Sequence, residues 1–176
     1  MKPSRSLINV LQSRPHATGV EVGVWRGDMA RKLLEHFPDL QHLYAVDPWR
    51  TFDDYDEKKN DTALLDAAFA TCVEYSLIYT DAGRMTILRE TSVEAARHLP
   101  DAAFDFVYID ANHSYEHAAQ DVRLWLPKVK PGGILSGHDY RRDRFGVKRA
   151  IDEMFGFDNV NKAGAAVWWV PVEAES

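Results

Sequence analysis

The chain has 176 residues, of which 45% are hydrophobic, and a formal net charge of -6. This length suffices for one domain with its own core, and the acidic balance argues against a nucleic-acid partner, which needs basic patches. The single cysteine, Cys72, excludes an intramolecular disulfide. No window reaches the roughly 18 apolar residues of a membrane-spanning helix, and no signal-peptide core is present. We therefore expect one cytoplasmic domain over residues 1–176, with no membrane partner.

The first half of the chain predicts alternating helices and strands. Residues 1–16 have one apolar side and predict an opening helix, and the core follows over residues 18–171. Short apolar runs between helical segments are typical of buried parallel strands. The strands expected here are 18–24, 43–46 and 85–89, and the helices are 29–36 and 62–79.

The second half continues the alternation. A Thr-x-x-Glu capping box at Thr91 predicts a short helix through His98. The remaining expected strands are 104–109, 134–137 and 167–170, with helices at 115–126 and 147–155 and a Pro-Gly-Gly turn at 131–133. This order predicts a doubly wound α/β domain with a mainly parallel sheet and helices on both faces. Such sheets bind ligands at the carboxyl ends of their strands.

A glycine turn follows the first expected strand. Gly23 and Gly27 are four residues apart at a strand-to-helix junction, where glycines let a ligand approach the backbone closely. The spacing is not the G-x-G-x-x-G of nicotinamide enzymes. Glu21, inside the motif, would suit a ligand with an ammonium group and no phosphate. A purely structural glycine turn is the alternative.

Two polar positions follow the next strands. Asp47 ends the second strand about twenty residues after the first glycine, where a carboxylate can accept the hydroxyls of a ribose. The alternative role for Asp47 is a turn cap, because Asp before Pro is common in turns. Ser92, after the third strand, can meet an adenine edge through its hydroxyl or backbone amide, although it also makes sense as part of a helix cap.

Acidic and histidine side chains follow the fourth and fifth strands. Asp110 ends one strand, and His138 and Asp139 end the other. Neighbouring strands lie about 4.8 Å apart, so both carboxylates can share a cation, and oxygen ligands favour Mg²⁺. His138 either adds a nitrogen ligand or only lines the pocket. A salt bridge to Arg141 or Arg144 is the structural alternative for Asp139.

His113 lies three residues after Asp110, on the loop before the next helix. An imidazole there can take the proton of an acceptor hydroxyl, because its pKa is near neutrality. A histidine at a helix entry with no catalytic role is the alternative.

Four segments resemble a known family: VEVGVWRGDMA, LYAVDPW, VYIDANHSYEHAAQDVRLWLPKVKPGGILSGHDY and GVKRAIDEMF. They are similar to class I S-adenosylmethionine-dependent methyltransferases. More narrowly, they resemble the group of macrocin-type O-methyltransferases and cephalosporin-hydroxylase-like proteins. The resemblance spans roughly residues 18–171 and implies a Rossmann-like methyltransferase fold with a sheet of the seven-stranded type.

The resemblance also implies roles for individual residues. For the donor S-adenosylmethionine, the implied binding residues are Glu21, Gly23 and Gly27 at its methionine part, Asp47 at the ribose and Ser92 near the adenine. Asp110 is implied at the border of the same site. Asp110 and Asp139 would bind Mg²⁺, with His138 as a third candidate ligand. His113 would match the base of the sugar O-methyltransferases.

The expected activity is methylation of a hydroxyl on a sugar or other small polar molecule, assisted by Mg²⁺. An aromatic lid of Trp49, Phe52 and Tyr55, and an arginine group of Arg141, Arg142 and Arg144 suited to a nucleotide sugar, are hypotheses for the acceptor side. The alternative function is a non-catalytic module or partner subunit that binds S-adenosylmethionine or S-adenosylhomocysteine. A homodimer is also expected, because a partner subunit can complete an acceptor site.

Overall fold

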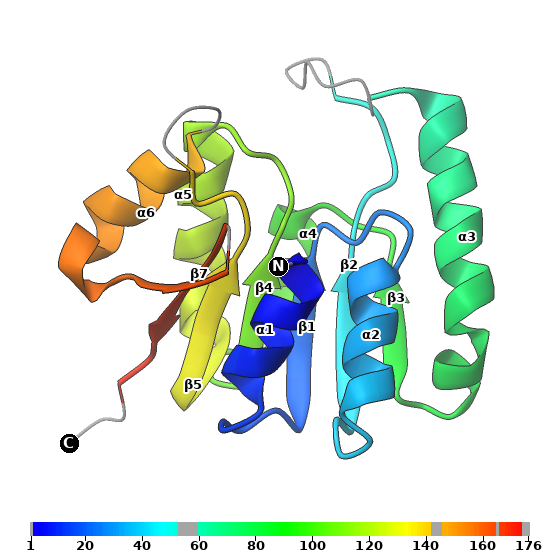
Figure 1. The fold of residues 1–176 in the computed structure, drawn as a ribbon. Coiled ribbons are helices and arrows are strands. Elements are labelled where there is room, and N and C mark those ends of the chain that lie inside the picture. Colours follow the sequence, from blue (N-terminus) through cyan, green and yellow to red (C-terminus); the bar gives the residue numbers. More distant parts are fainter. Residues whose placement is uncertain (1, 53–59, 142–145, 165, 174–176) are drawn as a thin grey trace.

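The computed structural model describes residues 2–52, 60–141, 146–164 and 166–173. Within these ranges, one seven-stranded sheet has the order β3-β2-β1-β4-β5-β7-β6 (Figure 1). The strands are β1 (Thr18–Val22), β2 (His42–Val46), β3 (Met85–Leu88), β4 (Phe104–Ile109), β5 (Val129–Gly137), β6 (Asn161–Ala163) and β7 (Val167–Pro171). β1 to β5 pair in parallel, whereas β7 runs antiparallel to β5 and to β6. This topology confirms the predicted α/β class.

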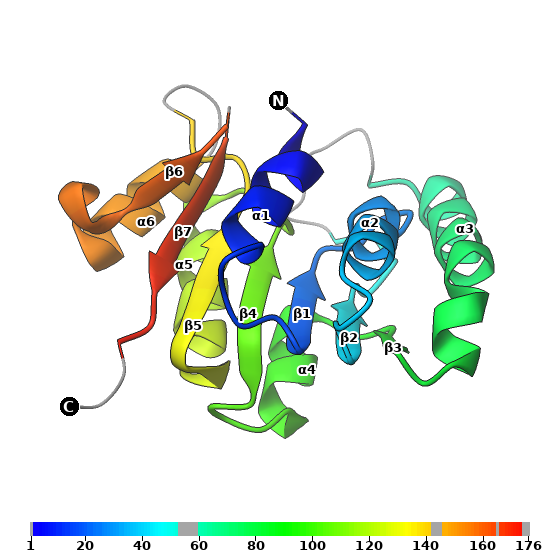
Figure 2. The same cartoon turned by 60° about the horizontal axis from the view of Figure 1, so that its bottom comes forward.

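Helices cover both faces of the sheet, as Figures 1 and 2 show from two directions. They are α1 (Pro3–Leu11), α2 (Asp28–His36), α3 (Thr62–Asp81), α4 (Ser92–His98), α5 (Tyr115–Trp125) and α6 (Val147–Phe155), with short 3₁₀ turns at Leu126–Lys128 and Phe157–Asn159. One core packs α1, α2 and α3 on the sheet, and the other packs α4, α5 and α6 on the opposite face. No described helix has both the length and the apolar character to cross a membrane.

β4 lies in the middle of the sheet and is buried along its whole length. Because successive side chains of a strand point to opposite faces, Phe106 and Tyr108 enter the α1–α3 core while Val107 and Ile109 enter the other core. The nearly continuous apolar sequence of this strand, interrupted by Asp105, is therefore typical of a sheet covered on both sides.

The helix starts agree with their sequence signals. Thr91 accepts the backbone N–H of Glu94, and the Glu94 carboxylate accepts the N–H of Thr91, which completes the expected capping box. Ser114 caps α5 by accepting the N–H of His117. These caps fix where the chain leaves the ligand-binding edge of the sheet and enters each helix.

Two boundaries and one strand differ most clearly from the sequence expectation. The opening helix ends at Leu11, because Pro15 cannot continue a helix. β5 begins at Val129, since the Pro-Gly-Gly segment stays in the ladder, where Gly132 and Gly133 exchange backbone hydrogen bonds with Val172. β6 was not expected, because its three polar or small residues carry no apolar pattern.

Candidate active site

A cleft of about 460 Å³ lies at the carboxyl ends of the parallel strands. This is the edge at which doubly wound sheets bind ligands. Of the donor, metal and base candidates named from the sequence, those that line the cleft are Glu21, Gly23, Asp47, Ser92, Asp110 and His113. The cleft therefore brings together side chains that are far apart in the chain.

The glycine turn brings the ends of β1 and β4 into contact. Gly23 has φ +88°, and a Cβ atom there would lie 2.2 Å from the backbone oxygen of Asp110, so only glycine fits. Gly27, with φ +79°, caps α2, and a Cβ there would lie 3.1 Å from the sulfur of Cys72. Gly23 thus shapes the cleft itself, whereas Gly27 permits the close packing of α2 against α3.

Glu21 presents a buried carboxylate to the cleft. The residue is 2% exposed, and its Oε2 atom has no hydrogen-bond partner within the described ranges. Burial, followed by the nearby carboxylates of Asp110 and Asp47, raises the pKa of Glu21 well above its ordinary value. An ammonium group of a ligand would satisfy both the missing hydrogen bond and the local excess of negative charge. The site therefore fits the amino end of a methionine-type donor.

Asp47 organises the turns around the cleft. Its Oδ2 accepts the backbone N–H groups of Val24 and Trp25 at 2.9 and 3.0 Å, and its Oδ1 accepts that of Trp49 at 2.8 Å. Trp25 and Trp49 both have positive φ angles, 55° and 42°, which are unusual for bulky residues. The sequence offered Asp47 two roles, a turn cap and a ligand-binding residue. In the structure Asp47 caps a turn and also lines the cleft. A contact with ribose stays a prediction.

Ser92 belongs to a polar chain at the wall of the cleft. Its hydroxyl donates to Asp121 Oδ1 at 2.5 Å and accepts from the indole Nε1 of Trp125 at 2.8 Å. Asp121 is 4% exposed, and burial raises its pKa to about 6. The Ser92 hydroxyl therefore already donates to Asp121 and accepts from Trp125, and a contact of Ser92 with adenine stays a prediction.

The sequence analysis did not predict Asp121 as a residue of the site, although the helical pattern around it contained a signal. It is an acidic residue in the helical repeat of buried positions formed by Ala118, Val122 and Trp125. A charged residue on the buried side of a helix needs a partner, and Ser92 supplies it here. The pattern alone could not identify Ser92 as that partner.

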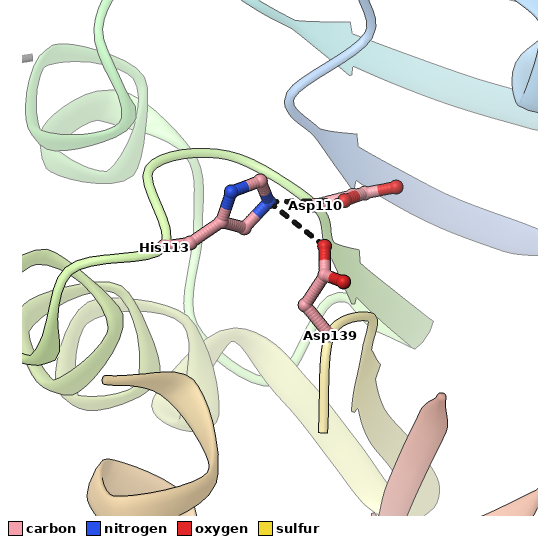
Figure 3. A group of neighbouring side chains, drawn as sticks. All are labelled: Asp110, His113 and Asp139. Atoms are coloured by element: carbon pink, nitrogen blue, oxygen red, sulfur yellow. Dashed lines mark ion pairs between the residues drawn. The ribbon is translucent and has the colours of Figure 1, made fainter. Parts of the chain in front are cut away.

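Asp110, His113 and Asp139 meet where β4 and β5 end (Figure 3). His113 Nε2 lies 3.1 Å from Asp139 Oδ2 and 3.5 Å from Asp110 Oδ1. One ligand atom from each residue falls within 4.8 Å of the others, a spacing that can hold a metal ion. The expectation that the two carboxylates meet at neighbouring strand ends is therefore confirmed by the geometry.

The two histidines named from the sequence lie differently around this group. The loop after β4 returns over the strand ends and is held by the hydrogen bond from Gly146 N to His113 O, which directs His113 toward the carboxylates. His138 Nδ1 instead contacts Asp139 Oδ2 at 3.0 Å. Although burial opposes it, this hydrogen bond and the charges of both histidines lower the pKa of Asp139. His138 thus orients a carboxylate, and His113 occupies the candidate ligand position.

The predicted aromatic lid is wrong for Trp49. This side chain is 2% exposed, packs on Phe69 with ring centroids 4.9 Å apart, and donates its indole N–H to Trp25 O. Phe52 does line the cleft. Of the arginine group, Arg141 is exposed, with its Nε 4.0 Å from Asp139 Oδ1. The other residues of both hypotheses lie outside the described ranges: Tyr55, Arg142 and Arg144.

Comparison with known proteins identifies the class. Residues 20–140 match a family model described as a methyltransferase domain. This match covers more than half of the chain, so the chain belongs to the methyltransferase-domain family. The resemblance to class I S-adenosylmethionine-dependent methyltransferases is thereby confirmed at the level of the family.

A curated relative matches part of the chain. The uncharacterized protein y4gI of Sinorhizobium fredii is 33% identical over 63 residues, which cover 35% of this chain and 7% of that protein. The aligned part is therefore a small fraction of a much longer protein.

Several solved structures have the same fold at low identity. An O-methyltransferase from Bacillus cereus in complex with SAH is 11% identical, with TM-score 0.65, over 97% of this chain and 82% of its own. The O-methyltransferase TomG from Streptomyces achromogenes, in complex with SAM, is 15% identical, with TM-score 0.65, over 97% and 78%. A spermidine synthase from Thermotoga maritima is 17% identical, with TM-score 0.61, over 94% and 56%. Because this last neighbour is not named as a methyltransferase, the fold alone does not decide the reaction.

Proposed function

We propose that the chain is an S-adenosylmethionine-dependent O-methyltransferase that acts on a hydroxyl of a small polar molecule such as a sugar. The observation that carries this proposal is the buried Glu21 carboxylate, whose Oε2 atom has no hydrogen-bond partner among the described residues, in a large cleft that Asp110 and His113 also line. The family supports methyl transfer, and the neighbours named as O-methyltransferases with SAH or SAM support the donor and the oxygen acceptor.

The donor supplies a sulfonium methyl group, and the chain supplies its binding site. Glu21 binds the ammonium group, and the turn through Gly23 lets the donor approach the ends of β1 and β4. Asp47 holds the backbone of that turn in place and lies in the same cleft. Holding the two reactants in line can account for much of the rate acceleration of a methyl transfer.

The cluster of Asp110, His113 and Asp139 serves the acceptor. Its two carboxylates fit a divalent cation such as Mg²⁺, which would supply Lewis-acid activation of a hydroxyl when bound, and the His113 imidazole is left for proton transfer. His113 accepts the proton, and the carboxylates beside its Nε2 stabilise the charge that the imidazole gains. A single nitrogen lone pair serves one role at a time, so proton acceptance and cation ligation by His113 exclude each other.

A methyl-transfer assay over a panel of hydroxyl acceptors, including free and nucleotide-linked sugars, tests this proposal. We expect a methyl ether to form on at least one acceptor, with lower turnover after addition of EDTA. Turnover that EDTA leaves unchanged would remove the cation from the proposal. Binding of the donor without transfer to any acceptor would instead support the non-catalytic binding module.

A cytoplasmic location and a homodimer are two further proposals, and both rest on the sequence. α3 exposes the large apolar side chains of Leu64, Tyr75, Leu77 and Ile78. Light scattering of the purified chain measures its oligomeric state, and a monomeric mass at all concentrations would contradict the homodimer.

A further inference from the structure

α3 exposes large apolar side chains to solvent. Five such side chains are exposed in the part of the chain that the structure describes, and four of them lie on α3: Leu64, Tyr75, Leu77 and Ile78. The fifth, Phe157, packs against the ammonium groups of Lys148 and Lys162. The inner side of α3 is buried as well, and a helix that is apolar on all sides is typical of a buried element. The outer side of α3 therefore fits a second apolar surface.

Part of this outer side forms an apolar stripe, which we call the α3 stripe. It consists of residues three or four positions apart, which share one side of a helix: Leu64, Ala67, Thr71, Tyr75 and Ile78. None of the five is charged, and the Thr71 hydroxyl donates to the backbone oxygen of Ala67. Figures 1 and 2 show α3 at one end of the domain, with α2 beside it and no described element against its outer side.

The α3 stripe is symmetric about Thr71. Leu64 and Ile78 lie seven residues before and after this position, and the inner pair, Ala67 and Tyr75, lies four residues before and after it. At a twofold interface, residue i contacts residue j of the other copy, and j contacts i. For antiparallel helices, an axis at Thr71 places Leu64 against the partner's Ile78. It also places Ala67 against the partner's Tyr75, so that a small side chain meets a large one, as close packing requires.

Charged side chains border the α3 stripe on the side of α2. The Cζ atom of Arg31 lies 5.8 Å from the centroid of the Tyr75 ring, and the guanidinium pairs with Asp28 and Glu35. An apolar centre with a polar rim is the usual anatomy of a protein interface. Because this rim carries charges of both signs, it can meet a copy of itself despite the net charge of -6.

We propose that the α3 stripe is the twofold interface of a homodimer, in which two copies of α3 pack antiparallel across Thr71. The 20 residues of α3 give a contact about 30 Å long and about 10 Å wide, which is less than the roughly 800 Å² per partner of a standard interface. The dimer is therefore weak, with a dissociation constant on the order of micromolar. The contact lies at one end of the cleft, since Leu65, next to Leu64, lines it.

Sedimentation equilibrium of the purified chain over a range of concentrations tests the interface. The wild-type mass should rise from monomer to dimer with concentration. Ile78→Lys places an unpaired charge against the partner's Leu64 and should raise the dissociation constant of the dimer at least about tenfold. A positive charge suits the last turn of a helix, so this variant should fold. Leu77→Lys is the matched control, because Leu77 is exposed on the same turn but lies outside the stripe, and it should leave the dimer unchanged.

A double variant tests the antiparallel register. Leu64→Glu alone should weaken the dimer as Ile78→Lys does. In one chain, the two substitutions place opposite charges against each other at both ends of the antiparallel pair, so the dimer should be restored at least in part. A parallel pair would bring like charges together.

Three outcomes would each overturn the inference: a monomeric wild-type protein at all concentrations, equal effects of Leu77→Lys and Ile78→Lys, or a double variant no more dimeric than the single variants. The inference does not depend on methyl transfer. Binding of S-adenosylhomocysteine, measured on the same samples, tests the proposed function separately.

Discussion

The two histidines near the carboxylates differ in what their ring nitrogens contact. His113 Nε2 faces both Asp110 and Asp139, whereas His138 Nδ1 lies closest to Asp139. His113→Ala should therefore lower kcat by about 10²- to 10⁴-fold, the range for loss of a general base, and His138→Ala should lower it less. Steady-state kinetics of both variants checks this order. Equal losses would contradict the distinct roles.

Glu21 predicts a pH dependence for donor binding. Its raised pKa means that the free protein holds a proton that an ordinary glutamate would already have lost. An ammonium ligand favours the ionised carboxylate, so binding releases protons, and affinity for S-adenosylhomocysteine should rise with pH until Glu21 is ionised in the free protein. Calorimetry in two buffers of different ionisation enthalpy measures the released protons, and Glu21→Gln should release none.

Asp121 predicts a pH-dependent gain in stability on substitution. Its pKa rises from 3.8 to about 6 on folding. Between pH 3.8 and pH 6 the Asp121 carboxyl is therefore ionised in the unfolded chain but still protonated in the folded one. This difference lowers the free energy of unfolding by up to about 3 kcal/mol above pH 6. Asp121→Asn can still accept from Ser92. The stability of this variant relative to wild type should therefore increase from about pH 4 to about pH 7, as measured by urea unfolding.

The pKa of Asp105 shifts in the opposite direction to that of Asp121. Although burial opposes it, the hydrogen bonds from Lys130 and Thr18 lower the pKa of Asp105. Its contribution to stability is therefore present at neutral pH and is lost as the pH falls. Asp105→Asn should destabilise the protein more at neutral pH than in acid, and parallel trends for both variants would contradict this assignment.

At the scale of elements, the turn after β1 is the most constrained connection. Gly23 and Gly83 both have positive φ, but a Cβ atom at Gly83 meets nothing within 4 Å, whereas one at Gly23 collides with the Asp110 backbone. Gly83→Ala should cost about 1–2 kcal/mol of stability from its dihedral angles alone, and Gly23→Ala should cost more and abolish donor binding. Thermal unfolding and calorimetry of both variants separate the two effects.

The elements also show what local sequence can predict. The apolar runs of β1, β2 and β4 and the capping box at Thr91 were sufficient, because burial on both faces and a local cap each leave a pattern in the nearby residues. β6 left no such pattern, since a short edge strand is defined by its pairing with β7. The start of β5 depends likewise on its pairing with β4 and with the segment at Val172.

At the scale of the whole molecule, the parallel sheet places the ends of β1, β2, β4 and β5 at one edge. This topology made Asp47, Asp110 and Asp139 predictable as a group, because each follows a strand, and Glu21 joins them because it lies near the carboxyl end of β1. The choice between His113 and His138 was not predictable, since it depends on the path of the loop after β4. The burial of Trp49 was also unpredictable, because a packed tryptophan and a lid tryptophan look alike in sequence.

The central claim is that the cleft at this edge binds a methyl donor. Calorimetric titration with S-adenosylhomocysteine, run once with Mg²⁺ and once with EDTA, tests it most directly. We predict saturable binding with a dissociation constant on the order of micromolar in both conditions, because Glu21 and the Gly23 turn hold the donor without the cation. The absence of binding in both conditions, with the protein folded, would contradict the account.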